Sequence, residues 1–270
     1  MPSPKRISLV ITTYNWPDAL RRSVESAWRQ VRMPDEIIIA DDGSGEETRA
    51  LIAELQQQSP VPIIHSWQED DGFRLNRSRN LAIAKVSSDY IVVIDGDIVM
   101  HSHFLADHQE MAKPGYCLAG RRMYMNPTLS QRVLDGYVPH MLSPGIHAHR
   151  SDLIRPVWLR NLRSSVCHKL RGFYGANMSF WHNDALKVNG FNEAFTGWGG
   201  DDLEFAIRLM NIGVHKIRIR HGATAFHIYH TESHRAISPE NHAEFEKTRI
   251  ESLTWCEQGL NSHLSEKASD

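Results

Sequence analysis

The strongest constraint on the fold is a regular alternation of short apolar runs and amphipathic segments through the first hundred residues. The apolar runs are rich in β-branched residues and lie at 7–12, 36–40, 61–66 and 90–94. Short runs of this kind are typical of strands buried in a parallel sheet. The segments between them predict helices at 19–30, 46–58 and 77–85. The sequence therefore predicts an α/β fold with a Rossmann-like, mostly parallel central sheet flanked by helices.

Beyond residue 97 the alternation is less regular. We expect strands at 116–125, 176–181, 215–219 and 223–229, and helices at 202–212 and 239–258. Residues 126–172 form a long, irregular stretch with weak helical signals.

Composition excludes several classes of protein. The 270 residues are 41% hydrophobic and 23% charged, which is typical of a globular protein, and the net charge of -2 argues against a nucleic-acid binder. Three widely spaced cysteines do not form a disulfide framework. The sequence shows neither a signal peptide nor an apolar run of about 20 residues, so we expect a cytoplasmic protein, at most peripheral at the inner face of a membrane.

Polar residues follow three of the predicted strands. The first strand ends in Thr12-Thr13-Tyr14-Asn15, the second in Asp41-Asp42-Gly43-Ser44 and the fourth in Asp95-Gly96-Asp97. Ligands of parallel α/β sheets bind beyond the carboxyl ends of the strands. The pair of carboxylates in the third cluster suits a hard divalent cation, and Gly96 would let a diphosphate approach the backbone. A simple strand-ending turn is the alternative, because Asp-Gly is common in turns.

Residues 198–202 form a further cluster that carries candidate chemistry. Trp198, Gly199 and Gly200 offer an aromatic platform and room for a sugar ring, and a carboxylate of the following pair, Asp201 and Asp202, could accept a proton. Acidic capping of a helix is the alternative for this pair.

Histidine is abundant, with 16 residues, which raises the expectation of metal or proton chemistry. His227 and His230 lie three positions apart, and side chains at that spacing in a strand face opposite sides. Both therefore reach one metal only if the strand ends or bends between them. Buried structural histidines are the alternative, and the other histidines have no supporting context.

Basic residues gather in two segments. Arg74, Arg77 and Arg79 lie at the start of a predicted helix and could hold a phosphate, or could be a solvated basic surface. The stretch from Arg150 to Arg171 carries six basic residues and one acid, Asp152. It is predicted either as a solvated loop or helix face, or as a basic flap over a phosphorylated or lipid-linked substrate, with peripheral contact to a membrane surface.

Together these segments resemble the nucleotide-sugar glycosyltransferases of family 2, which have a single-domain GT-A fold. The motifs of the first part are SLVITTYN (8–15), DDGS (41–44), RN (79–80) and DGD (95–97). The motifs GANMSF (175–180), GFNE (190–193) and GWGGDD (197–202) resemble the galactosyltransferase-type carboxyl half of bacterial chondroitin-type polymerases and animal β-1,4-galactosyltransferases. The resemblance spans about residues 6 to 232.

The resemblance implies a role for each matching residue. Donor binding is assigned to Thr12, Tyr14, Asp41, Asp42, Arg74, Arg79, Asp95 and Gly96. Asp97 and a histidine, His230 with or without His227, are assigned to a metal, which Asp95 either shares or leaves for the ribose. Asp202 is implied as the catalytic base and Asp201 as a holder of the acceptor, although relatives commonly have Glu at position 201. Trp198, Gly199, Gly200 and Asn177 are assigned to the acceptor.

The implied reaction is an inverting transfer of a hexose or N-acetylhexosamine from a UDP-sugar, with Mn²⁺ or Mg²⁺, to a hydroxyl of a bacterial-type surface glycan or glycolipid. Residues 1–97 would form the donor-binding half, 98–235 the acceptor-binding and catalytic half, and 236–270 a terminal helix and tail. A sugar-1-phosphate nucleotidyltransferase is one alternative, but it needs a Gly-rich loop where this chain has Thr12 to Pro17 without a glycine. A non-catalytic carbohydrate-binding protein is the other, and it leaves the carboxylates at the strand ends unexplained.

Overall fold

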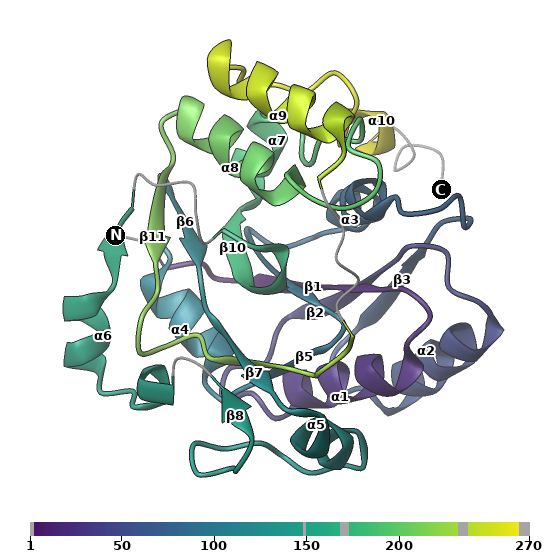
Figure 1. Ribbon diagram of the computed structural model, residues 1–270, viewed down its shortest axis with the longest axis vertical. Helices are drawn as coiled ribbons and strands as arrows, with labels where there is room; N and C mark the ends of the chain where they lie inside the picture. The colour runs from purple at the N-terminus through teal and green to yellow at the C-terminus, as the bar shows by residue number, and fades with distance from the viewer. Residues whose placement is uncertain (1–2, 148–149, 168–172, 232–236, 265–270) are drawn as a thin grey trace.

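A central sheet of eight strands organises the computed structural model, which describes residues 3–147, 150–167, 173–231 and 237–264 (Figure 1). The strand order is β3–β2–β1–β4–β10–β6–β11–β9. The bounds are β1 Ile7–Thr13, β2 Glu36–Asp41, β3 Ile63–Trp67, β4 Tyr90–Asp95, β6 Tyr116–Ala119, β9 Ser165–Val166, β10 Met178–Trp181 and β11 His215–Arg218. The first four strands are parallel, as predicted, whereas β10 runs antiparallel to both β4 and β6.

Helices cover both faces of this sheet. One face is covered by α1 Pro17–Trp28, α2 Glu46–Gln58 and α4 Phe104–Met111, and the other by α3 Leu75–Ala84, α7 His182–Lys187 and α8 Asp201–Asn211. Beyond α7 and α8 lie α9 Pro239–Ile250 and α10 Asn261–Leu264 (Figure 1). The predicted single α/β domain is confirmed.

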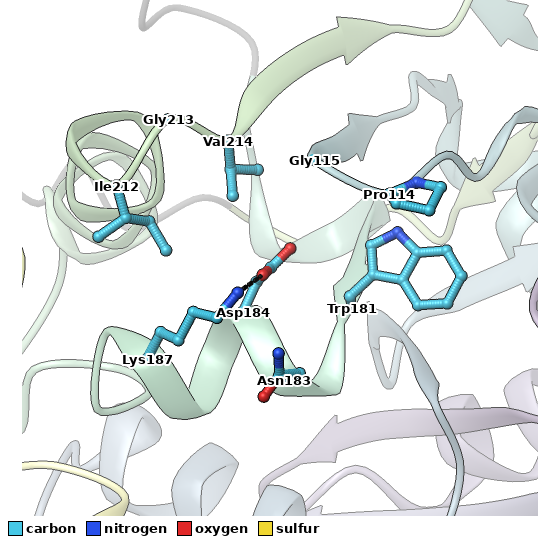
Figure 2. Close-up of a pocket in the computed structure, with 9 residues that line it drawn as sticks. All are labelled: Pro114, Gly115, Trp181, Asn183, Asp184, Lys187, Ile212, Gly213 and Val214. Carbon is cyan, nitrogen blue, oxygen red and sulfur yellow. Dashed lines mark hydrogen bonds and ion pairs between the residues drawn. The ribbon is translucent and has the colours of Figure 1, made fainter. Parts of the chain in front are cut away.

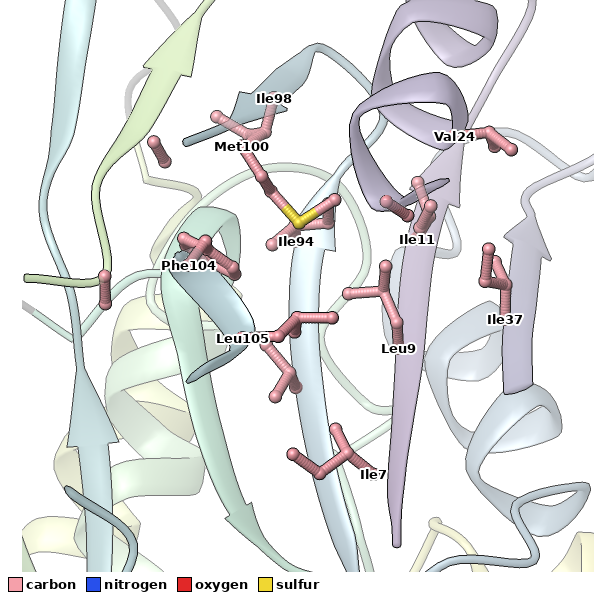
Figure 3. Close-up of a cluster of buried hydrophobic side chains, with 14 of the residues drawn as sticks. Ile7, Leu9, Ile11, Val24, Ile37, Ile94, Ile98, Met100, Phe104 and Leu105 are labelled. Carbon is pink, nitrogen blue, oxygen red and sulfur yellow. The ribbon is translucent and has the colours of Figure 1, made fainter. Parts of the chain in front are cut away.

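The apolar strands alternate between two cores because successive side chains of a strand point to opposite faces. Leu9 and Ile11 of β1 are buried against α1, α2 and α4, in the cluster shown in Figure 3. Val10, between them, is buried on the side of α3 and α8. Burial on both faces explains why these strands are continuous apolar runs.

A second, four-stranded sheet has the order β5–β12–β7–β8. Its bounds are β5 Ile98–Met100, β7 Arg122–Met125, β8 Ile146–His147 and β12 Ala225–His227. It packs on α5, Pro127–Leu134, through an apolar cluster that includes Met123, Leu129 and Phe226. The remaining described elements are α6 Val157–Arg163 and two 3-10 turns, Arg150–Leu153 and Gly175–Asn177.

The structure corrects two of the predicted elements. The expected strand 116–125 is two strands, β6 and β7, which belong to different sheets; the chain breaks at Gly120, where the side chain of Asn177 fills the space that a Cβ would take. The expected helix 239–258 ends at Ile250, and Ser252 then adopts a left-handed φ of 52°.

The basic stretch also differs from the prediction of a basic flap. The side chains of Arg155 and Arg160 turn inward and form ion pairs with Asp107, a buried residue of α4. Their charges are therefore neutralised within the protein. Lys169 and Arg171 of the same stretch lie outside the described residues.

The positions of the cysteines and the lengths of the helices bear on the expectations about disulfides and membrane spans. No disulfide joins Cys117, Cys167 and Cys256, which all lie in the described residues. Across the described ranges, every helix is too short or too polar to cross a bilayer.

Candidate active site

The polar ends of β1, β2 and β4 meet at one edge of the central sheet, as predicted. The strand register places Thr12 beside Asp95 and Thr13 beside Asp41. Thr12 Oγ1 donates a hydrogen bond to Asp95 Oδ1 at 3.2 Å. Parallel pairing alone brings these groups together, because the three strands end in line.

One carboxylate and two imidazoles form a compact group beside this edge. Asp97 Oδ2 lies 3.2 Å from His227 Nε2 and 3.3 Å from His230 Nε2. Strand β12 ends at His227, and the backbone N–H of Ile228 donates to the Asp97 carbonyl. The strand end between the two histidines is the condition under which both can face one metal.

This group offers the ligand atoms that a divalent cation needs, including a carboxylate oxygen that no described residue binds. Its three candidate ligand atoms all lie within 4.8 Å of one another. Asp97 Oδ1 is buried and has no hydrogen-bond partner among the described residues. Burial alone would raise the pKa of Asp97, but hydrogen bonds from both imidazoles outweigh it and hold that pKa well below its usual range. The residues therefore fit a cation bound by oxygen and imidazole nitrogen.

Asp95 lies outside this group of three ligands. Its carboxylate is 3.9 Å from Arg79 Nη2 and 3.9 Å from Arg122 Nη1. Burial and the charge of Asp97 raise the pKa of Asp95, while the two arginines oppose that shift. Asp95 thus joins the metal side of the site to its arginines.

Arg79 connects the strand ends to the start of α8. It is buried, and its Nη1 donates to Asp201 Oδ2 and to Asp202 Oδ1, both at 2.9 Å. Its guanidinium also stacks over the Phe191 ring at 4.9 Å. The described partners of Arg79 are carboxylates of the protein, and its contact to a nucleotide stays a prediction.

The two acids at the start of α8 are held differently. Asp202 accepts from Arg79 on one oxygen and from the Gly175 backbone N–H, at 2.6 Å, on the other. Burial and the neighbouring Asp202 raise the pKa of Asp201 to about 6, against the effect of Arg79. The carboxylates are thus bound to Arg79 rather than used as a helix cap, which sets aside the capping alternative.

The two aspartates at the end of β2 have separate environments. Asp41 is fully buried and binds His65 Nε2 and the Ser44 N–H, both at 2.8 Å. Both of its oxygens are thus bound within the protein, and its assignment to donor binding stays a prediction. Asp42 accepts from Gln68 and from the Arg74 backbone N–H, and burial raises its pKa to about 6.

The side chain of Arg74 points away from Asp42. Its Nη2 lies 2.8 Å from Asp71 Oδ2 at the protein surface. Arg74 therefore contacts Asp42 through its backbone, and the assignment of Arg74 to donor binding stays a prediction. Tyr14, by contrast, is half exposed at the site and donates from its hydroxyl to Asp70.

The side chain of Asn177 is held inside the protein. It is buried, accepts from His108 Nε2 at 3.0 Å, and donates to the carbonyls of Arg121 and Ala223 at 2.9 and 2.8 Å. This side chain joins the two sheets, and its role in acceptor binding stays a prediction.

Glycine is required for different reasons in the DGD motif and in the GWGGDD motif. The Thr12 carbonyl occupies the space where a Cβ on Gly96 would lie, so packing alone requires glycine there. Gly199 and Gly200 adopt φ values of 103° and 93°, which side-chain-bearing residues rarely take. These values turn the chain into α8 and leave Trp198 about half exposed, at 51%.

Strand β7 carries a basic and aromatic group that was not predicted from the sequence. Arg122 and Tyr124, two positions apart, lie on the same face of the strand. Arg122 Nε donates to the Tyr124 hydroxyl at 3.1 Å, and its guanidinium lies over the rings of Tyr124 and Tyr174. The Tyr124 ring in turn packs against His227. The alternation along β7 was the only signal, and it was hidden by the prediction of one strand through 116–125.

Two pockets lie on the surface, of which one adjoins the residues described above and the other lies away from them. One, of about 710 Å³, borders Asp42's partners and is lined by Trp67, Gln68, Asp71 and Arg74 among others. The other, of about 320 Å³, lies where β6 and β11 begin, at the opposite edge of the sheet from the site (Figure 2). Asp184 and Lys187 pair with each other inside it at 3.0 Å, and it contains none of the predicted site residues.

Two family profiles match the sequence. The profile described as "Glycosyl transferase family 2" matches residues 8–173, and the one described as "N-terminal domain of galactosyltransferase" matches 163–234. A chondroitin synthase of Escherichia coli is 29% identical over 240 residues, which are 82% of this chain and 34% of the relative. A validoxylamine A glucosyltransferase of Streptomyces hygroscopicus subsp. limoneus is 27% identical over 233 residues, which are 77% of this chain and 48% of the relative. The chain thus spans about a third to a half of these curated relatives.

Solved structures share the fold. TarS of Staphylococcus aureus aligns with a TM-score of 0.64 and 14% identity over 96% of this chain and 41% of its own. The mannosyltransferase PcManGT of Pyrobaculum calidifontis, solved with GDP-Man and Mn²⁺, aligns with a TM-score of 0.58 and 15% identity over 100% of this chain and 66% of its own.

Proposed function

The chain belongs to glycosyl transferase family 2, and we propose that it is an inverting, metal-dependent enzyme that transfers a hexose or N-acetylhexosamine from a UDP-sugar to a hydroxyl of a glycan or glycolipid. One observation carries the proposal: the Asp97–His227–His230 group and the Asp201–Asp202 pair belong to one connected site, because Arg79 contacts both Asp95 and the acid pair.

The proposed reaction is a single displacement at the anomeric carbon. Asp202 accepts the proton of the acceptor hydroxyl as its oxygen bonds to that carbon. The bond from the carbon to the diphosphate breaks at the same time, and UDP leaves with the electron pair. Arg79 and the Gly175 N–H hold the two oxygens of Asp202 in place before the acceptor arrives.

A divalent cation, Mn²⁺ or Mg²⁺, would be held by Asp97, His227 and His230. When bound, it would neutralise negative charge on the departing diphosphate. Arg122 supplies a fixed positive charge on the same side, since it lies 3.9 Å from Asp95. The Mn²⁺ that accompanies GDP-Man in the PcManGT complex supports the choice of metal.

We assign donor recognition to residues 1–97 and acceptor binding to 98–235. Thr12, Tyr14 and Asp42 lie at the sheet edge where a nucleotide would bind. The half-exposed ring of Trp198 offers an apolar surface to an acceptor sugar next to Asp201. The names of the two curated relatives, a synthase of chondroitin and a glucosyltransferase, support a sugar donor and a carbohydrate-related acceptor.

The deciding experiment separates donor binding from transfer. UDP release from UDP-glucose, UDP-galactose and their N-acetyl forms is measured with Mn²⁺ and after its chelation. We expect release that requires the metal, and Asp202→Asn should keep Mn²⁺-dependent UDP binding while its transfer rate falls at least about a hundredfold. Loss of UDP affinity in Asp202→Asn would contradict its assignment as the base.

Histidine variants test the cation site. His230→Gln should weaken Mn²⁺-dependent UDP binding, because it removes the imidazole of one of the three proposed metal ligands. His242→Gln is the matched control, since His242 is exposed on α9. Equal UDP binding by both variants in titration calorimetry would refute the role of His230.

A further inference from the structure

Helix α6 has its polar and apolar faces reversed relative to an ordinary surface helix. Val157, Trp158 and Leu162 are 57%, 67% and 71% exposed, and Asn161 and Arg163 are exposed beside them. Ile154, one turn before, is 53% exposed, and Val166 in the edge strand β9 is 43% exposed. Surface helices normally bury such residues, and a contiguous apolar patch on a protein surface commonly marks an interaction site.

The inner face of α6 is fixed by ion pairs. Arg160 is buried and lies 2.5 Å from Asp107, and it also pairs with Glu110. Arg155, just before the helix, lies 2.6 Å from Asp107, whose other oxygen accepts the backbone N–H of Ala223. These ion pairs hold α6 in the orientation that exposes its apolar side chains. The exposure is therefore a fixed feature of the packed helix.

Positive charge surrounds the apolar face. Arg150 and Arg163 are exposed at either end of the segment, and Arg218 and Arg220 lie beside β9 on the neighbouring strand and its continuation. The acids close to the segment are already paired: Asp152 binds Arg121 and Arg220, and Glu110 binds Arg160. The surface is therefore apolar at its centre and cationic at its margin.

We propose that this face, Ile154 to Val166, docks on an anionic lipid bilayer. Trp158 would sit at the headgroup level, Val157 and Leu162 would enter the acyl boundary, and Arg163 would contact lipid phosphates. A tryptophan amid aliphatic residues with arginines at the edge suits an interface that is apolar on one side and negatively charged on the other. Bilayer docking would bring the enzyme to a lipid-linked acceptor, a role that rests on the proposed function.

The test is flotation of the full chain with vesicles of phosphatidylcholine alone or mixed with phosphatidylglycerol. We expect binding to the mixed vesicles, and a drop of about tenfold in partitioning for Trp158→Ser or Leu162→Ser. Arg163→Gln should weaken binding to the mixed vesicles. Ile250→Ser is the matched control, because Ile250 at the end of α9 is 71% exposed, like Leu162, and should bind as the parent does.

The contrary outcomes are equally distinct. Absence of vesicle binding, or equal loss in Ile250→Ser and Leu162→Ser, would overturn the proposal. A concentration-dependent dimer in light scattering that Leu162→Ser abolishes, without vesicle binding, would assign the face to a second copy instead. Metal-dependent UDP release in the absence of vesicles should be the same in every variant, so a failure of docking is distinguishable from a failure of the transferase assignment.

Discussion

At the scale of single residues, Arg79 determines how the acids of the site are arranged. Its partners Asp201 and Asp202 are 122 and 123 residues away in the chain. Three carboxylates around one buried guanidinium are tolerated because charge and hydrogen bonding compensate their burial. The arginine thus links the proposed base to Asp95 at the end of β4.

Gly175 is predicted to control the position of Asp202. A Cβ at this position would collide with Arg79 Nη2 and approach Asp202 Oδ1 to 3.0 Å. We expect Gly175→Ala to lower kcat about a hundredfold, because a small displacement of a catalytic group is costly, with little change in UDP affinity. Steady-state kinetics and UDP titration measure the two effects.

Gly45→Ala provides the control for that variant. Its φ of -76° suits any residue, and an added Cβ would meet only Asn15 Oδ1, at 3.8 Å. It should retain the parental kcat. A normal kcat in Gly175→Ala would show that Asp202 does not depend on this contact.

Asp42 is predicted to make stability depend on pH. Its pKa rises from 3.8 to about 6 on folding, so the folded protein binds the proton more tightly than the unfolded chain does. The contribution of Asp42 is therefore most favourable below pH 3.8 and is lost as the pH rises to about 6. The loss amounts to about 2 to 3 kcal/mol.

Asp42→Asn removes this titration. Urea unfolding of both proteins should show the variant gaining free energy of unfolding relative to the parent between pH about 4 and pH about 7. A difference between the two proteins that stays constant over this range would contradict the raised pKa.

At the scale of elements, the join between the two sheets depends on Asn177. Its side-chain amide bridges His108 of α4 to the carbonyls of Arg121 and Ala223, which precede β7 and β12. Gly120 leaves room for that amide between β6 and β7. His227 on β12, a candidate metal ligand, is thereby connected to the central sheet.

Asn177→Ala should act on stability. It would leave buried polar groups unpaired, so the free energy of unfolding should fall by about 2 to 4 kcal/mol.

Trp198→Ala should instead affect acceptor binding. It should raise the acceptor KM with little change in the melting temperature, because Trp198 is half exposed. Denaturation and acceptor kinetics on both variants give the comparison; an unchanged melting temperature in Asn177→Ala would contradict its structural role.

At the scale of the whole molecule, donor and metal are predicted to bind as one unit. The proposed nucleotide residues lie in the first half of the chain, whereas two of the three candidate metal ligands lie at residues 227 and 230. UDP with Mn²⁺ should therefore stabilise the entire fold. At a hundredfold excess over its Kd the gain is about 2.7 kcal/mol.

A thermal-shift panel measures this coupling. We expect a larger shift with UDP and Mn²⁺ than with UDP after chelation, and a smaller one with GDP. A GDP shift equal to the UDP shift would count against uracil recognition, and a shift that ignores chelation would count against the metal.

How far the sequence could predict the molecule depends on the range of the interactions. The parallel strands and their polar ends were predictable, because strand patterning and turn residues act over a few positions. The break of 116–125 into two strands was not, since it arises from the contact of Asn177 with Gly120 across the fold. The same holds for Arg155 and Arg160, which form ion pairs with Asp107 of α4.

The sequence by itself determined the alternating sheet and helices, the acids at the strand ends and the condition under which two histidines could share a metal. Tertiary packing fixes that β12 ends at His227, that Arg79 turns to Asp201 and Asp202, and that Arg160 of α6 is buried while Val157, Trp158 and Leu162 are exposed. The physical reason is that a charged or amide side chain acquires its role from its partners. Those partners lie tens to more than a hundred residues away, and only packing brings them together.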